Sequence, residues 1–108
     1  MSLLFPLDDN GNPVPVLRFV SRGTQKLVVT SVSVRNPEPL PEDVELVTLI
    51  ATGSCRFEVG DAGVTADPAT SPFLYPGQYV DVPLAPEERY VAFVADGPDC
   101  LAYVIARR

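Results

Sequence analysis

Residues 90–106 read Tyr-Val-Ala-Phe-Val-Ala-Asp-Gly-Pro-Asp-Cys-Leu-Ala-Tyr-Val-Ile-Ala. Two apolar runs, residues 90–95 and 100–106, are separated by the turn sequence Asp96-Gly97-Pro98-Asp99. This pattern predicts an antiparallel hairpin in which Phe93 lies opposite Ala102. Because nearly every position of both runs is apolar, we expect both faces of the hairpin to be covered, by a second sheet or by another chain.

Strand patterns also occupy most of the preceding chain. Alternating or continuous apolar runs lie at residues 16–20, 24–34, 44–51, 54–59 and 78–84, and they are typical of strands. No stretch shows helical periodicity over ten residues or more. The sequence therefore predicts an all-β fold, an antiparallel β-sandwich of jelly-roll or immunoglobulin-like type with about seven strands, over residues 16–108. The expected core includes Val32, Ile50, Phe57, Val82, Phe93 and Val104.

Local signals sharpen this prediction at three places. In residues 54–59, clean alternation points Cys55, Phe57 and Val59 inward. Pro76-Gly77 is a type II turn signature, and Pro83 is expected to place the end of its strand at a sheet edge. The segments 36–43 and 60–72 are predicted to be surface loops.

Residues 1–15 are predicted to form an extended N-terminal arm. Prolines at positions 6, 13 and 15 are incompatible with a regular central strand. Four apolar side chains make the arm too hydrophobic for a free tail: Leu3, Leu4, Phe5 and Leu7. They either fold back onto the domain's own sheet or lie on a neighbouring subunit, and the sequence leaves both open.

Composition argues against several functions. The 108-residue chain has a formal net charge of −6 and a pI near 4.4, which disfavours binding to nucleic acid or anionic membranes. It contains no histidine, the usual general base and a common metal ligand. We therefore expect no enzymatic activity, no cofactor and no metal site. No run reaches membrane-spanning length and the start has no basic leader, so synthesis in the cytoplasm without export is expected.

Two cysteines, Cys55 and Cys100, each fall in a predicted strand. They are expected to be small buried thiols. The alternative is a disulfide that joins the two sheets, which would suit an oxidising location such as a particle outside the cell.

The order of motifs over residues 44–106 resembles small β-sandwich proteins encoded among the virion genes of tailed bacteriophages. The resemblance rests on Leu-Ile-Ala-Thr-Gly-Ser-Cys-Arg-Phe-Glu-Val-Gly at 49–60, Ala69-Thr70, Phe-Leu-Tyr-Pro-Gly-Gln-Tyr-Val-Asp-Val at 73–82, and the closing strands. The family pattern has Leu-Pro where this chain has Leu74-Tyr75-Pro76, and a small polar residue where it has Arg56. These two departures bear on which subfamily the chain resembles and less on the class of protein.

The resemblance implies a structural role in the virion without catalysis or cofactor. The expected function is that of a capsid decoration (cement) protein that stabilises the capsid lattice, or else of a head–tail or tail component. The implied partners are the major capsid protein or other virion proteins, together with further copies of the chain, preferably as a trimer. The alternative is a carbohydrate- or protein-binding module, for which Tyr75 and Tyr79 beside the Pro76-Gly77 turn are the candidate contact residues.

Overall fold

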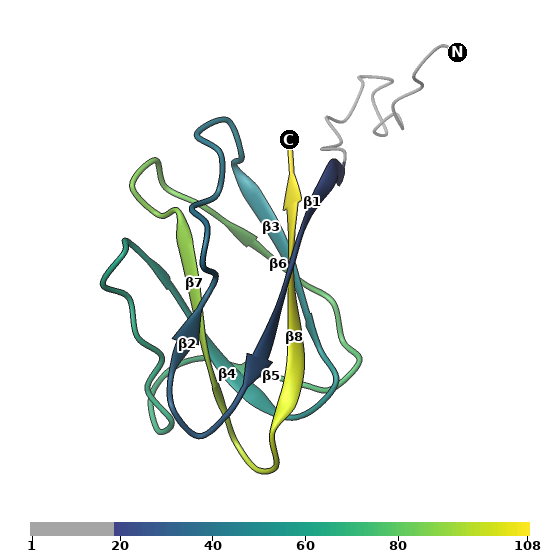
Figure 1. Ribbon diagram of the computed structural model, residues 1–108, viewed down its shortest axis with the longest axis vertical. Coiled ribbons are helices and arrows are strands. Elements are labelled where there is room, and N and C mark those ends of the chain that lie inside the picture. Colours follow the sequence, from purple (N-terminus) through teal and green to yellow (C-terminus); the bar gives the residue numbers. More distant parts are fainter. Residues whose placement is uncertain (1–18) are drawn as a thin grey trace, which may run out of the picture.

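The computed structural model describes residues 19–108, which form two antiparallel sheets of four strands each (Figure 1). These residues contain no helix. The strands are β1 (Phe19–Val29), β2 (Val34–Arg35), β3 (Leu46–Ala51), β4 (Cys55–Gly60), β5 (Phe73–Leu74), β6 (Val80–Pro83), β7 (Tyr90–Ala95) and β8 (Cys100–Arg107). The predicted all-β architecture is confirmed, with eight strands in this part of the chain.

The chain passes repeatedly from one sheet to the other. One sheet has the strand order β1-β8-β3-β6 and the other β2-β7-β4-β5, so only β4 and β5 are consecutive strands of the same sheet. The inner faces of both sheets contribute to one hydrophobic core, which includes Leu27, Leu49, Leu74, Phe93 and Val104. Burial of these side chains is the main force that holds the two layers together.

The predicted hairpin of residues 90–95 and 100–106 is wrong. β7 pairs with β2 and β4, whereas β8 pairs with β1 and β3. The turn at Asp96–Asp99 therefore carries the chain across the core, and Gly97 adopts a φ of 138° there. The two strands are separated because each has a buried face, with Phe93 on one wall of the core and Ala102 on the other.

The predicted long strand of residues 24–34 is confirmed over residues 24–29, and its continuation to residue 34 is wrong. β1 ends at Val29, and β2 belongs to the opposite sheet. Val32 lies in the connection between them and is 72% exposed, so its predicted place in the core is a second error. The Thr30 hydroxyl accepts a hydrogen bond from the Val32 N–H at 3.2 Å, a local turn that interrupts the extended pattern.

Other parts of the predicted core are confirmed in varying degree. Phe57, Phe93 and Val104 are buried, and Val82 is half-buried against the core. The predicted core position of Ile50 is wrong: it is half-buried and lies beside Tyr103 on the outer face of its sheet, because the inward positions of β3 are Val47, Leu49 and Ala51. Pro83 ends β6, which lies at a sheet edge as predicted.

The start of β1 differs from the predicted short strand at 16–20. β1 continues through Arg22 with a register irregularity between Phe19 and Thr24, and Arg22 has a positive φ of 59°. The arm, with Leu3, Leu4, Phe5 and Leu7, lies outside the described residues.

Candidate interaction surfaces

The outer face of the β1-β8-β3-β6 sheet carries a continuous group of apolar side chains. Strand register places Val28 beside Leu101 and Tyr103 beside Ile50. Val28 is 61% exposed, and the others on this face are half-buried. We call this surface the apolar face; its members are Val28, Leu46, Ile50, Leu101, Tyr103 and Ile105.

The outer face of the β2-β7-β4-β5 sheet, by contrast, has its apolar side chains covered by a loop. Ala92 and Val94 of β7 also point away from the main core, yet both are buried. They pack with Val64 and Ala66 from the loop between β4 and β5. This loop is held in place by hydrogen bonds such as the one from the Ala66 N–H to the Ser33 hydroxyl at 2.8 Å. One sheet is thus covered by its own loop, while the apolar face retains accessible side chains.

Charged residues of opposite sign border the apolar face. Lys26 lies on β1 at one edge of the sheet, and Asp81 on β6 at the other. Asp81 accepts a hydrogen bond from the Thr48 hydroxyl at 2.6 Å and forms an ion pair with Arg107 at 3.5 Å. The Asp81 side chain is still 55% exposed, so it can contact a partner.

Tyr75 and Tyr79 flank a rigid turn between β5 and β6. The Gln78 N–H donates to the Tyr75 carbonyl at 3.2 Å, and Gly77 has a φ of 74°, which confirms the predicted type II turn. The Gly77 N–H donates to the Ala51 carbonyl at 2.9 Å and so attaches the turn to β3. Tyr75 and Tyr79 are 62% and 66% exposed.

The aromatic group at this turn includes one more ring. Phe73 contacts Tyr75 edge to face, with 4.7 Å between ring centroids. The Arg56 guanidinium lies 5.6 Å from the Phe73 centroid and donates to the Ser71 carbonyl at 2.9 Å. Such a supported aromatic surface can contact a partner at little entropic cost.

A buried asparagine that the sequence analysis missed organises the loop between β2 and β3. Asn36 is fully buried, and its carboxamide oxygen accepts from the Val91 N–H at 2.8 Å. Its side-chain nitrogen donates to the Glu38 carbonyl. The Asn-Pro dipeptide signalled a turn, but no local pattern indicated burial of its side chain.

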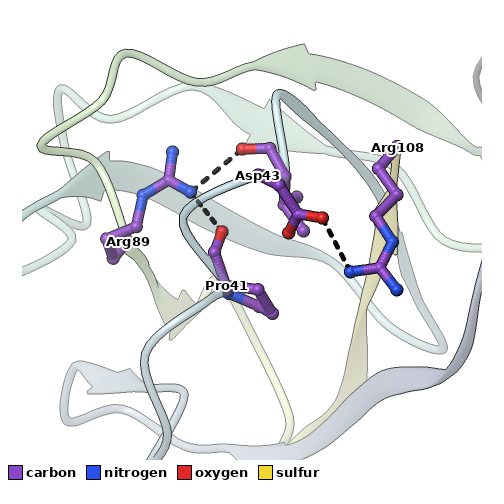
Figure 2. A network of polar contacts seen from close by, with 5 residues as sticks. Pro41, Asp43, Arg89 and Arg108 are labelled. Atoms are coloured by element: carbon purple, nitrogen blue, oxygen red, sulfur yellow. Dashed lines mark hydrogen bonds and ion pairs between the residues drawn. The ribbon is translucent and has the colours of Figure 1, made fainter.

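Two arginines hold the far end of the same loop (Figure 2). The Arg89 guanidinium donates to the carbonyls of Pro41 and Val44 at 2.6 and 3.0 Å. Arg108 forms an ion pair with Asp43 at 2.8 Å. The loop is therefore attached to the start of β7 and to the end of β8.

The two cysteines face one another from opposite sheets, Cys55 on β4 and Cys100 on β8. Both are buried free thiols. The pKa of Cys55 is raised from 9.0 to about 12, chiefly by burial and to a smaller extent by the charge of the neighbouring Cys100 thiol and a hydrogen bond with it. The predicted buried thiols are confirmed in this structure.

This pKa shift predicts a loss of stability at high pH. The folded chain keeps the Cys55 thiol neutral, whereas the unfolded chain ionises it above pH 9. The contribution of Cys55 to the free energy of unfolding is therefore fully present below pH 9. It should fall by about 1.4 kcal/mol per pH unit as the pH rises from 9 towards 12. Urea denaturation at a series of pH values would measure the slope. The Cys55→Ala variant should lose this component, and an identical slope in the variant would contradict the assignment.

Within residues 19–108, no group of three or more histidine, cysteine or acidic side chains could hold a metal ion. No helix in this part of the chain is long and apolar enough to cross a membrane. A comparison with family models, curated proteins and solved structures finds no match for this chain.

Proposed function

We propose that this chain is a non-enzymatic structural protein of a tailed bacteriophage particle, a capsid decoration (cement) protein that stabilises the capsid lattice. The apolar face is the observation that carries the proposal. It combines Val28, Tyr103 and Ile105 on the outer face of one sheet, and exposed apolar patches of this kind favour protein partners. The resemblance of residues 44–106 to small virion proteins points to the same class.

The strand order supports the proposal at the level of the fold. We infer that the two sheets form a jelly roll, because the orders β1-β8-β3-β6 and β2-β7-β4-β5 are those of two interleaved Greek keys. Jelly rolls occur in viral capsid domains and in lectins. A fold alone does not imply a function, so the apolar face remains the main support for the proposal.

The proposed location is the virion, and the proposed partners are the major capsid protein and further copies of this chain. Opposite charges at the two edges of the apolar face, Lys26 and Asp81, favour contact between two copies related by a two-fold axis parallel to the strands. A trimer is the state that the resemblance implies. A place at the neck or tail would use the same apolar face.

A charge placed on the apolar face should weaken attachment to the particle. Tyr103→Glu would bring a carboxylate into the proposed interface, where its desolvation opposes binding. Because Tyr103 lies opposite Lys26 on β1, the new charge has a cross-strand partner and the fold should persist. We expect at least about tenfold weaker binding, equivalent to about 1.4 kcal/mol, measured by cosedimentation with capsids that lack this protein.

Two further variants serve as controls for this experiment. Val32→Glu places the same charge in the exposed loop between β1 and β2 and should bind capsids as the wild type does. If Tyr103→Glu also binds normally while a Tyr75→Ala/Tyr79→Ala double variant does not, the interface lies at the turn instead. If the wild-type chain does not bind capsids, the decoration function is wrong.

A carbohydrate-binding function is the second candidate, because Tyr75 and Tyr79 are the most exposed tyrosines of the described chain that flank a rigid turn. Aromatic rings with a polar tip suit contact with sugar rings. The apolar face has no role in that function, which is why we place it second.

A further inference from the structure

A groove lies at the end of the two sheets where β1 begins. It has a volume of about 660 Å³ and runs between β1 and the loop after β2. Its lining includes the apolar residues Val20, Leu40 and Ala106. Three cationic residues, Arg22, Lys26 and Arg108, and one acidic residue, Glu38, also line it. The groove shares Lys26 with the border of the apolar face and is separate from the tyrosine turn.

One wall of the groove is an available strand edge. β1 is the outermost strand of its sheet and pairs only with β8. An outermost strand offers backbone N–H and C=O groups to an added strand. The left-handed conformation of Arg22, with a φ of 59°, lies within this wall; such a conformation in a residue other than glycine is uncommon and is often found at binding sites.

The opposite wall is fixed before any partner arrives. Residues 37–41 are part of the loop that buried Asn36 holds from inside, and the Leu40 N–H donates to the Arg89 carbonyl at 2.9 Å. Arg89 also donates to the Pro41 carbonyl (Figure 2). A wall held in this way loses little entropy on binding.

The groove contains groups suited to an acidic, extended peptide. The carboxamide oxygen of Gln25 is buried and has no hydrogen-bond partner, while its nitrogen donates to the Glu38 carbonyl at 3.2 Å. Arg22 and Lys26 form no ion pair with any residue of the range 19–108.

The chain itself contains a segment with the matching chemistry. Residues 3–9 read Leu-Leu-Phe-Pro-Leu-Asp-Asp, an apolar run followed by two carboxylates. Asp8 and Asp9 are the only acidic residues before Glu38. The apolar run suits the apolar lining of the groove, and the two aspartates suit Arg22 and Lys26.

Proline content favours a neighbouring copy as the source of this segment, and the chain is long enough to reach one. Nine residues, 10–18, separate Asp9 from Phe19, and an extended chain of that length spans roughly 30 Å. Asn12 and Val14 each precede a proline, which favours extended backbone and opposes a reversal back towards the same β1.

We propose that this groove binds residues 3–9 of a second copy of the chain, as a strand added beside β1. The inference deepens the proposed function and rests on it, because attachment to a capsid lattice would hold the copies of this chain side by side. It assigns a role to Leu3, Leu4, Phe5 and Leu7 as the apolar part of the inserted segment. Each copy would then donate one segment and accept another.

A charge-swap experiment with full-length chains tests the proposal. One variant carries Asp8→Lys and Asp9→Lys, and the other carries Arg22→Glu and Lys26→Glu. Each alone should self-associate at least about tenfold more weakly than the wild type, because like charges meet in the groove. The two variants mixed at equal concentration should recover association, since each segment then meets a groove of opposite charge. Sedimentation velocity over a concentration series at low salt would measure this.

A matched control separates groove binding from net charge. Asp96→Lys with Asp99→Lys makes the same charge change in the exposed turn before β8 and should self-associate as the wild type does. Loss of self-association in this control would overturn the proposal, because net charge alone would then explain the effect of the Asp8→Lys/Asp9→Lys variant. So would failure of the two swap variants to recover, which would mean that the segment binds its own groove or another protein. Capsid binding of Tyr103→Glu is measured separately, so failure here leaves the decoration function standing.

Discussion

Replacing Phe93 with alanine should lower the free energy of unfolding by about 3–5 kcal/mol. Phe93 is fully buried and is the largest fully buried side chain of the described residues. It lies in the middle of β7, between Val34 of β2 and Phe57 of β4 in the strand register. Its removal would leave a cavity at the centre of the core that neighbouring side chains fill only in part. Urea denaturation at neutral pH would measure the change.

Phe19→Ala is the matched control for this variant. Phe19 is 64% exposed, and its ring contacts the Arg107 guanidinium at 4.8 Å, so its loss should cost less than about 1 kcal/mol. A cost for Phe93→Ala as small as this would show that β7 has slipped by one residue, with Phe93 outside the core.

Asn36→Ala should destabilise the protein by about 2–4 kcal/mol. The substitution removes the acceptor of the Val91 N–H, which lies in a strand buried on both faces. It also removes the donor to the Glu38 carbonyl. A buried backbone N–H without a partner bears its full desolvation cost. Thermal and urea unfolding would both report the loss.

Thr52→Ala provides the comparison for Asn36→Ala. The Thr52 hydroxyl accepts from the Leu101 N–H at 3.0 Å, but this residue is exposed. Water can replace the hydroxyl, so the cost should stay below about 1 kcal/mol. Equal effects of the two substitutions would mean that Asn36 is accessible to solvent and does not hold the loop. Because that loop is a wall of the groove, Asn36→Ala should also weaken self-association.

The local features of the fold were predictable from sequence because short-range geometry produces them. Alternation at Cys55 and Phe57 follows from the two-residue period of a strand, and both side chains are buried. The turn at Pro76-Gly77 follows from the φ angles that proline and glycine favour. Pro83 lacks the N–H of a central strand and lies at an edge. Each of these depends on neighbours within a few residues.

The candidate surfaces were predictable only in part. Tyr75 and Tyr79 were selected because they flank a turn, and both are exposed. The apolar face was visible only as a surplus of hydrophobic residues in the last strands, with no indication of which sheet would carry it. Neither the buried Asn36 nor the groove left a local signal, because each is built from residues distant in sequence.

Only the tertiary structure decided where the chain crosses between the sheets. A turn such as Asp96–Asp99 joins two strands side by side or across a core, and both arrangements satisfy the same local pattern. Long-range contacts select the crossing here: the Ala95 N–H donates to the Thr30 carbonyl and the Asp96 N–H to the Ser54 carbonyl. Those pairings allow β7 and β8 to bury their inner faces against each other's sheets. The free energy of that burial, summed over residues far apart in sequence, outweighs the local preference for a hairpin.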